Sequence, residues 1–409
     1  MSATVGLNPA YKLGLLASLY LAQGIPFGFF TQALPVLMRE SGHSLKAIGA
    51  TGLLFLPWAL KFMIAPAVDR STSRKAWILS MQISTTVGAL LLMLVDLNRG
   101  MMWVFAALLL FNLFAATQDV ATDGLAVRLL SARERGLGNG VQVGAYRIGM
   151  VLGGGFLLWL FANSGWAVMF AAMAALLLLS CIPVWSLPAT HAANRPEPSP
   201  RHVGWTERIR SPGLLMFVGL ACCYKFGDAM AAALIAPFMV DAGWGTEQIA
   251  LIKGSVGSVM GLAGAALGGW MAFSLGRRPA ILLCGLLQAT SLLGYLLCTQ
   301  FPESFWLLAT ATTAEHLLGG TATVALFTLM MDASATDHAS TDYSLMACGV
   351  VVAGGVAAFA AGTIGDWAGF GAAFSCAALL SFGGCIAMVL AIDQGRGPAR
   401  LSAVWPPRP

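Results

Sequence analysis

Long apolar stretches alternate with short polar connections along almost the whole of this 409-residue chain. Crossing a hydrocarbon layer takes roughly 20 helical residues, and backbone groups in lipid must be satisfied within their own segment. The predicted spans cover residues 12–38, 47–68, 76–95, 101–128, 137–162, 165–187, 213–240, 246–273, 279–299, 304–331, 343–365 and 369–391. The pattern therefore predicts an all-α polytopic membrane protein with twelve transmembrane helices.

The spans fall into two sets of six, separated by one polar stretch. We expect residues 1–189 to form an N-terminal six-helix bundle and residues 213–391 a C-terminal one, joined by a cytoplasmic linker over 190–212 and followed by a cytoplasmic tail over 392–409. The loop after the first span, Ser41–Ile48, resembles the loop after the seventh, Ala242–Ile249, because both keep the same spacing from Gly to Ile. Two pseudo-symmetric bundles indicate a duplicated transporter.

Composition and charge agree with lipid as the solvent, since 58% of residues are hydrophobic and only 10% are charged. With both termini in the cytoplasm, sixteen Lys and Arg residues lie on the cytoplasmic side and three on the other side. The net charge of +5 therefore reflects membrane topology, and nucleic-acid binding is not expected. The eight cysteines lie inside predicted spans without metal-ligand spacing, so we expect no metal and no cofactor.

Ionisable residues inside the spans are the candidate functional residues, because each costs about 2.5–3.5 kcal/mol at the centre of a membrane helix. Lys61 and Lys253 lie near span ends, where their side chains could reach the interface. The charges nearer the middle of the spans are Asp119, Asp123, Arg147, Lys225, Asp228, Glu315 and His316.

Spacing leaves two interpretations of these central charges open. Asp119 and Asp123 share one helix face, and Lys225 and Asp228 are three residues apart on another helix. One interpretation is a set of structural ion pairs, including a pair between Asp119 and Arg147. The other is a polar pathway for substrate and protons, in which Glu315 or Asp119 is protonated reversibly. Glu315 suits this role because its own span offers no cation to stabilise the charged form of its carboxylate once it is buried.

Uncharged residues extend the predicted pathway. Its hydrogen-bonding members are Gln23, Gln32, Gln118 and Tyr146. Pro26 and Pro35 are expected to interrupt the first span and Pro237 the seventh, and broken helices at equivalent places indicate a binding cavity. The aromatic side chains of Phe27, Phe29 and Phe30 either line that cavity or, as we expect, face lipid.

Two cytoplasmic loops carry related charge patterns. The first is Asp69-Arg70-Ser71-Thr72-Ser73-Arg74-Lys75, and the second runs from Gly269 to Gly276-Arg277-Arg278. Both resemble the major facilitator superfamily signature G-x-x-x-D-R-x-G-R-R/K, although Ala65 replaces the first Gly, one residue is inserted, and Phe273 stands where the second copy should have Asp. We expect these loops to form a conformational latch, rather than only to set topology, through Asp69, Arg70, Arg74, Lys75, Arg277 and Arg278.

Two further motifs narrow the resemblance. Gln118-Asp119-x-x-x-Asp123 and Tyr146-Arg147-x-Gly149 are similar to the AmpG-like branch of that superfamily. The branch includes muropeptide permeases, acetyl-CoA transporters and rhizobactin/pyochelin-type siderophore importers. Because the chain stops at twelve spans, and because the stretch 20–35 is most similar to the siderophore importers, the resemblance favours the importers.

This resemblance implies a monomeric symporter of the bacterial inner membrane, which imports a ferric siderophore for iron uptake by proton-coupled alternating access. A muropeptide permease of the AmpG type is the alternative. Under either interpretation, the partners of the protein would be the small-molecule solute, protons and the lipid bilayer.

An enzyme and a channel are both disfavoured by the residues. Glu315-His316 and the group Asp332, Asp337 and His338 lack metal-ligand spacing, and no G-x-S-x-G nucleophile motif is present. A duplicated single chain also argues against a pore built from repeated polar rings.

Overall fold

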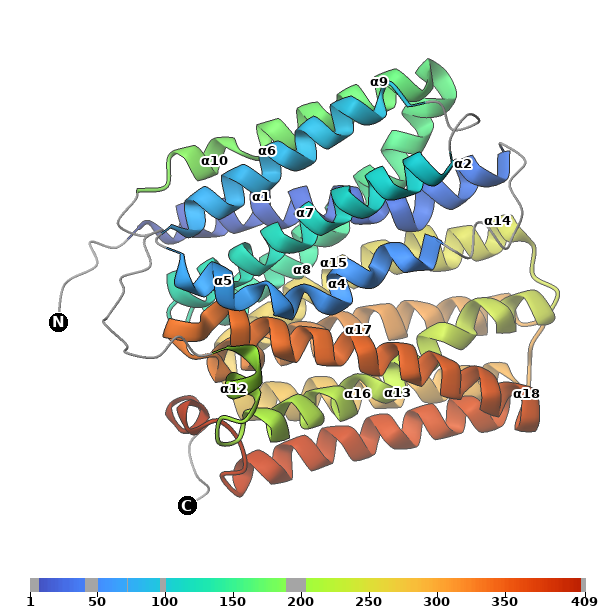
Figure 1. The fold of residues 1–409 in the computed structure, drawn as a ribbon. Coiled ribbons are helices and arrows are strands. Elements are labelled where there is room, and N and C mark those ends of the chain that lie inside the picture. The colour runs from blue at the N-terminus through green and yellow to red at the C-terminus, as the bar shows by residue number, and fades with distance from the viewer. Residues whose placement is uncertain (1–6, 41–50, 72, 96–100, 189–203, 406–409) are drawn as a thin grey trace. The chain divides into compact units, whose positions relative to one another are not determined.

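The computed structural model describes residues 7–40, 51–71, 73–95, 101–188 and 204–405. Every regular element among these residues is a helix (Figure 1). The loop Ser41–Ile48 and residues 190–203 of the predicted linker lie outside the described residues.

The first half of the chain contains the helices of the first six predicted spans. They are α1 (Pro9–Gly28), η1 (Phe29–Ala33), α2 (Leu34–Glu40), η2 (Thr51–Phe55), α4 (Leu56–Leu60), η3 (Lys61–Met63), α5 (Ala65–Arg70), α6 (Arg74–Leu92), α7 (Met101–Leu129), α8 (Arg135–Val151), η4 (Leu152–Phe156), α9 (Leu157–Leu179) and α10 (Ile182–Trp185). Here η1 and η4 are π-helical turns, whereas η2 and η3 are 3₁₀ turns.

The second half contains the helices of the last six predicted spans. Its elements are α12 (Trp205–Ile209), α13 (Leu214–Asp241), α14 (Thr246–Ile249), the π-helical η5 (Ala250–Val256), α15 (Gly257–Ser274), α16 (Arg277–Cys298), α17 (Phe305–Ala333), η6 (Thr336–His338), α18 (Ala339–Asp393) and η7 (Ala399–Ala403). Within the described residues, the short helices α12, η6 and η7 are the ones that no predicted span covers.

Nine helical stretches of the described chain are long and apolar enough to cross a membrane. Two of them bend sharply at a glycine, Gly165 inside α9 (φ 82°) and Gly369 inside α18 (φ 81°), where a side chain would be strained. Each of those stretches therefore holds two predicted spans, and the shorter apolar stretch Thr51–Met63 supplies the remaining one. The prediction of an all-α fold with twelve spans is confirmed.

The chain folds into two compact units. Unit 1 comprises Met1–Leu130, Gln142–Trp205 and Thr336–Ser344, and unit 2 comprises Ser131–Val141, Thr206–Ala335 and Leu345–Pro409. Each unit thus contains one short segment from the other half of the sequence: the start of α18 belongs to unit 1, and the start of α8 belongs to unit 2.

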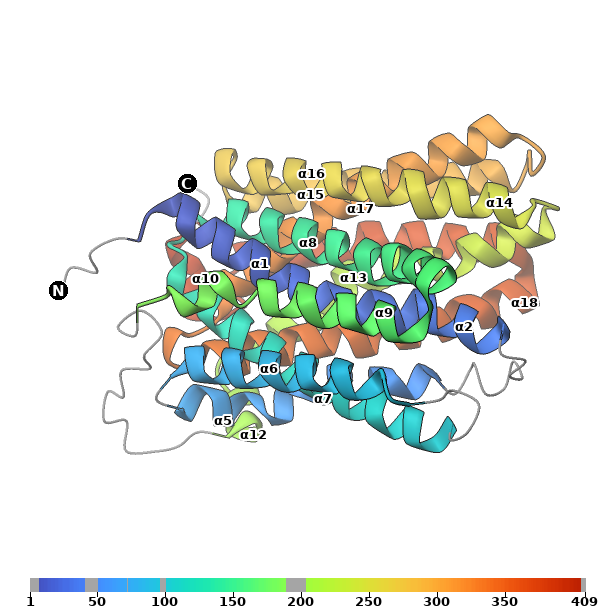
Figure 2. The ribbon, with the colours of Figure 1, turned by 90° about the horizontal axis from the view of Figure 1, so that it is seen from above.

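In unit 1, helix α6 packs against α7 and α9, and α1 packs against α7 and η4 (Figures 1 and 2). Its apolar core includes Phe29 and Phe30, which are 1% and 2% exposed, and Phe29 meets the ring of Phe170 edge-on at 5.2 Å. Phe27 packs against Trp58 and Tyr146. The expectation that these phenylalanines face lipid is therefore wrong, because they fill the interior of unit 1.

Helix α1 approaches α8 and η4 closely because glycines line both sides. A side chain at Gly149 would lie 2.8 Å from the Cα atom of Gly24 and would overlap the carbonyl of Leu21. Gly28 and Gly153 similarly face backbone atoms of the opposite helix. In lipid, such close van der Waals packing replaces the hydrophobic effect as the force that joins helices.

In unit 2, helix α17 packs against α15 and α16. Gly264 and Gly268 of α15 face the backbone of α17, where even a methyl group would be too large. Helix α13 continues through Pro237 without interruption, so the predicted break there is wrong. In the first span, the predicted break takes the form of the π-helical turn η1 between Pro26 and Pro35.

Beyond α18, the tail folds back onto unit 2. Trp405 donates its indole N–H to Asp393 (2.8 Å), and the same carboxylate receives two hydrogen bonds of 2.8 Å from Arg278 on α16. The beginning of the predicted cytoplasmic tail is thus a structured part of unit 2.

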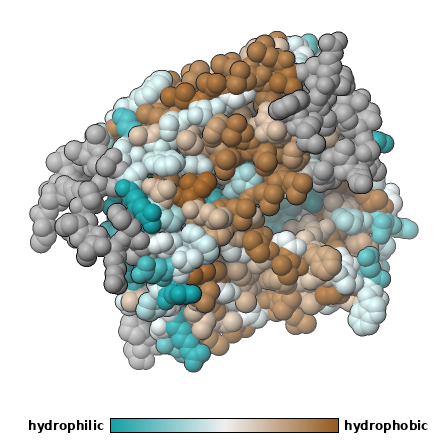
Figure 3. Space-filling model, viewed as in Figure 1, coloured by the Kyte–Doolittle hydropathy of each residue, from teal (hydrophilic) through white to brown (hydrophobic). Residues whose placement is uncertain are grey.

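Large apolar side chains are exposed, as expected where lipid is the solvent. Trp367 is 88% exposed, Leu94 83% and Phe359 80%. Hydrophobic residues cover the middle of the face seen in Figure 3, whereas hydrophilic residues gather toward the helix ends. This distribution is consistent with helices that cross a bilayer.

The contact between α1 and α8 makes a prediction about two neighbouring glycines. Replacing Gly149 by Ala should force the helices apart and destabilise the protein by about 1–3 kcal/mol, because overpacking is costly. Gly155→Ala is the matched control, since a methyl group there meets nothing within 4 Å. Thermal unfolding of the detergent-purified variants checks this, and equal melting temperatures would contradict the described helix contact.

Candidate functional site

The second span has an irregular backbone that places Lys61. Pro57 and Pro66 lack the N–H group that a regular helix needs, and the segment is divided into η2, α4, η3 and α5. Lys61 begins the 3₁₀ turn η3, in which its carbonyl accepts a hydrogen bond from the N–H of Ile64 (3.1 Å). The pieces α4, η3 and α5 all pack against α7, so the side chain of Lys61 lies beside that helix.

Lys61 forms ion pairs with two aspartates of α7. Its ammonium group contacts Asp119 directly and lies 3.3 Å from Asp123. Lys61 and Asp119 are each 6% exposed and Asp123 is 1% exposed. The interpretation that Lys61 reaches the membrane interface is therefore wrong. The predicted pair of Asp119 with Arg147 is also wrong, because Lys61 is the ion-pair partner of Asp119.

Neutral donors complete the surroundings of Asp123. The Tyr20 hydroxyl donates to one carboxylate oxygen of Asp123 (2.9 Å), and the Gln142 amide approaches the same oxygen at 3.5 Å. Gln142 also donates to the Tyr343 hydroxyl at 3.4 Å. We call Lys61, Asp119 and Asp123 the lysine–aspartate set. It contains two carboxylates for one ammonium group, so one further proton makes it electrically neutral.

The hydrogen bonds around Gln118 connect helices of unit 1. Its amide donates to the side-chain oxygen of Gln82 on α6 (3.2 Å). Gln82 in turn donates to the carbonyl of Leu177 and to the hydroxyl of Ser180, both at 2.8 Å. These hydrogen bonds join α7, α6 and the end of α9 inside unit 1.

The other predicted residues of unit 1 lie in different surroundings. Gln23 is 1% exposed, and neither atom of its amide group has a hydrogen-bond partner among the described residues. Gln32 is exposed on η1 and lies against Gly154. Tyr146 packs on Phe27, with ring centres 5.5 Å apart, and Arg147 is half-buried on α8.

Unit 2 contains a second polar cluster, on α13, α16 and α17. Lys225 and Asp228 form the ion pair that their spacing on α13 allows, and Lys225 also donates to the hydroxyl of Thr323 on α17 (3.1 Å). The other oxygen of Asp228, Oδ1, is buried and has no hydrogen-bond partner among the described residues.

Glu315 and His316 of α17 belong to the same cluster. His316 Nδ1 hydrogen-bonds to the carbonyl of Thr312 (3.0 Å). The same nitrogen lies 2.6 Å from Glu315 Oε2, but that oxygen has no partner with hydrogen-bonding geometry. The charge of Lys253 on η5 also acts on Glu315.

The first predicted latch loop holds the start of a distant helix. Asp69 pairs with Arg74 and accepts hydrogen bonds from the backbone N–H groups of Ser340 (3.1 Å) and Thr341 (2.8 Å). The Thr341 hydroxyl donates to the same carboxylate at 2.7 Å. Ser340 and Thr341 lie in the first turn of α18, so Asp69 satisfies N–H groups that a helix start leaves free. Gly124 of α7 leaves room for Ser340 and Arg74.

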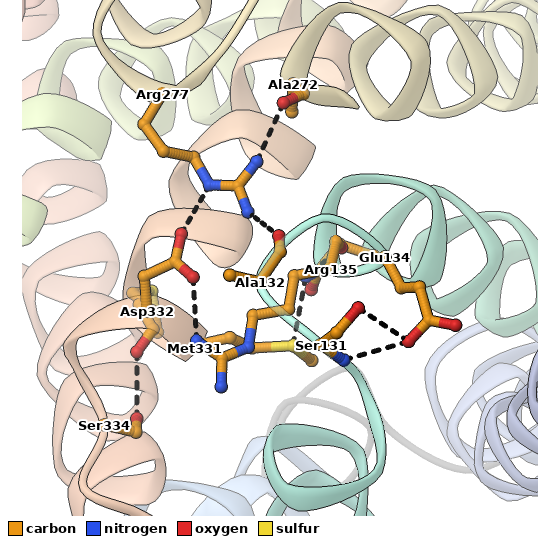
Figure 4. A network of polar contacts seen from close by, with 11 residues as sticks. Ser131, Ala132, Glu134, Arg135, Ala272, Arg277, Met331, Asp332 and Ser334 are labelled. Carbon is orange, nitrogen blue, oxygen red and sulfur yellow. Dashed lines mark hydrogen bonds and ion pairs between the residues drawn. The ribbon is translucent and has the colours of Figure 1, made fainter. Parts of the chain in front are cut away.

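The second latch loop has Phe273 at the position where the signature has Asp. Asp332 supplies the missing carboxylate to Arg277 of that loop. Figure 4 shows Asp332, at the end of α17, between Arg277 of α16 and Arg135 of α8. Arg277 also donates to the carbonyls of Ala272 (2.8 Å) and Ala132. Asp332 is 2% exposed, and two arginines form ion pairs with it.

The remaining latch residues have separate roles. Lys75 donates to the carbonyls of Trp185 (2.7 Å) and Leu187 (2.8 Å), which fixes the end of the sixth span. Arg278 binds Asp393 of the tail region, and Arg70 is exposed. The structure thus places Asp69 with Arg74 and Arg277 with Asp332, but it does not gather all six predicted residues into one group.

Four residues of these clusters were missed from the sequence, namely Tyr20, Gln82, Gln142 and Tyr343, and Asp332 was considered only as a candidate enzyme or metal residue. Asp332 had a usable signal, because a buried carboxylate is needed where the second signature has Phe273. The others are neutral residues whose spacing to their partners is set only by the fold. Among the described residues, no group of metal-ligating side chains occurs, and the eight cysteines are free thiols.

The fold and the buried charges describe a secondary transporter, and comparison with known proteins agrees. The family model of the Major Facilitator Superfamily matches residues 16–341. The chain therefore belongs to the Major Facilitator Superfamily. The proteins of this family are permeases rather than enzymes.

Several relatives in sequence are of the AmpG type. An anhydromuropeptide permease of Escherichia coli K12 is 29% identical over 346 residues, which are 82% of this chain and 70% of the relative. A putative AmpG transporter of Rickettsia conorii is 23% identical, over 82% of this chain and 86% of the relative. These names favour the muropeptide alternative over siderophore import.

Solved structures show the same fold at low sequence identity. The E. coli fucose:proton symporter matches 92% of this chain and 97% of its own with a TM-score of 0.72 at 14% identity. A proton:xylose symporter matches 98% of this chain and all of its own with a TM-score of 0.70 at 14% identity. These structures show that the chain has the same fold, and the family match makes it a multi-pass membrane transporter.

The lysine–aspartate set makes a prediction about stability. Lys61→Met should destabilise the protein by about 3–5 kcal/mol, because removing one partner leaves buried carboxylates without their counter-ion. Adding Asp119→Asn should recover much of that loss, since one buried charge is then gone. Unfolding of the purified single and double variants checks both steps. If Lys61→Met unfolds like the unmodified protein, the buried ion pair is not present in solution.

Proposed function

We propose that this protein imports anhydromuropeptides into the bacterial cytoplasm, coupled to protons. The protein would act as a monomer in the inner membrane, with both termini in the cytoplasm. In this proposal residues 1–189 and 213–391 are the two bundles of an alternating-access cycle. The similarity to an anhydromuropeptide permease over 82% of the chain supports the cargo.

The observation that carries the coupling is the lysine–aspartate set. Two buried carboxylates share one ammonium group, and in a low dielectric an uncompensated charge is expensive. One proton removes the net charge. Binding and release of that proton, on opposite sides of the membrane, would link the set to the proton gradient, with Tyr20 and Gln142 stabilising the charged form of Asp123.

The two carboxylates near helix ends support a latch. Asp69 and Asp332 each join segments that are far apart in the sequence. Such contacts stabilise only the conformation in which the segments meet. Asp69 with Arg74, and Asp332 with Arg135 and Arg277, would therefore hold one state of the transport cycle, and they would separate in the other state.

Uptake in cells tests this proposal. An E. coli strain lacking its own anhydromuropeptide permease should accumulate labelled anhydromuropeptides when it expresses this protein. Asp123→Asn should reduce accumulation at least tenfold, because its carboxylate can no longer take up the proton. Asp366→Asn is the control, since Asp366 is an exposed carboxylate, and it should leave accumulation unchanged.

Two results would contradict the proposal. One is absence of anhydromuropeptide uptake by a protein that reaches the membrane. The other is rescue of growth under iron starvation by a purified ferric siderophore, which would restore the siderophore interpretation.

A further inference from the structure

The polar cluster of unit 2 leaves several buried oxygen atoms without partners. Among the described residues, Asp228 Oδ1 has no partner, and Glu315 Oε2 lies 2.6 Å from His316 Nδ1 without hydrogen-bonding geometry. The Tyr295 and Thr312 hydroxyls interact with each other but also lack a partner with full hydrogen-bonding geometry. Tyr295 and Thr312 are 0% exposed and Glu315 is 8% exposed. Buried polar atoms nearly always have a partner, so a group of orphaned acceptors points to something that binds there.

These residues come together from three helices. Tyr295 of α16 lies near Thr312 and near the charges of Glu315 and Asp228. Thr312, Glu315 and Gly319 follow one face of α17, and Asp228 reaches the same place from α13. The side chains of Asp228 and His316 remain 14% and 17% exposed, so the cluster can be reached from outside unit 2.

Gly319 leaves a notch between the two carboxylates. A methyl carbon built on Gly319 would lie 3.4 Å from Glu315 Oε1 and 3.5 Å from Asp228 Oδ1. Both carboxylate oxygens therefore border the space over Gly319, and a small group that packs on the Gly319 Cα is within reach of both. Because Lys225 occupies the other oxygen of Asp228, Oδ1 stays available for it.

We propose that this notch binds a primary ammonium group of the transported solute. An ammonium group has three N–H donors and no acceptor, which suits a site lined by carboxylate and hydroxyl oxygens. It would donate to Asp228 Oδ1 and Glu315 Oε1, with the Tyr295 and Thr312 hydroxyls close by. Lys225 and Lys253 match the formal charge of the two carboxylates, so the empty site is tolerated in the membrane. This inference rests on the proposed function, because it names the part of the cargo that unit 2 recognises.

Uptake of paired solutes tests the notch. The probes are the amine-bearing fraction of labelled anhydromuropeptides and the same fraction after N-acetylation, which removes the positive charge and donors. The unmodified protein should take up the free amine at least about tenfold better at limiting concentration, since hydrogen bonds between charged groups are strong. Uptake of both forms at equal rates would overturn the inference and leave the proposed function standing, whereas uptake of neither would remove the proposed function itself.

Two variants test whether the preference for the free amine arises at the notch. Gly319→Ala adds a methyl group at ordinary contact distance, so the protein should fold while the notch is filled, and the uptake ratio of amine to acetylated form should fall toward one. Glu315→Gln should also lower that ratio, because it removes the charge but keeps the shape. Gly355→Ala is the matched control, since a methyl group there meets nothing within 4 Å, and its ratio should equal that of the unmodified protein.

Two outcomes of the variant series would overturn the inference. In one, Gly319→Ala lowers uptake of both forms equally, which means that the notch serves packing only. In the other, the ratio disappears when Na⁺ is replaced by choline, which means that the notch holds a metal cation instead of the solute.

Discussion

A charge buried among membrane helices must have a counter-charge within reach, and this constraint explains the buried ion pairs of the protein. Lys61 is held between Asp119 and Asp123, Asp332 between two arginines, and Asp69 by Arg74 and a helix start. Because each cluster draws on segments distant in the sequence, neutralising the charges also determines which helices meet. A change in protonation that alters one of these charges would therefore also alter a contact between helices.

The two halves of the chain compensate their buried charges at related positions but with different residues. Helices α7 and α17 both have 29 residues, and Asp119 and Thr323 hold the same position in them. Asp119 forms an ion pair with Lys61, whereas the hydroxyl of Thr323 accepts a hydrogen bond from Lys225. The first half therefore holds a compact charged set, and the second half keeps carboxylate oxygens available. We infer that proton coupling and solute recognition were divided between the halves in this way.

The sequence was sufficient for the fold because hydropathy alone defines membrane spans. Helix ends such as 101–129 and 305–333 lie within two residues of the predicted ones. The site was harder to predict. The i,i+3 pair Lys225–Asp228 follows from local spacing, but the partner of Asp119 does not, because the irregular segment around Pro57 and Pro66 turns Lys61 inward. Phe27, Phe29 and Phe30 were misplaced for a related reason, since apolar residues are equally suited to lipid and to a protein interior.

The central claim is that the lysine–aspartate set carries the coupled proton, and transport in proteoliposomes containing the Asp119→Asn and Asp123→Asn variants tests it most directly. Each variant should still exchange labelled for unlabelled anhydromuropeptide across the membrane, because exchange needs no net proton movement. Neither should accumulate the solute against its gradient when the outside is made acidic. Normal acid-driven accumulation by both variants would contradict the claim.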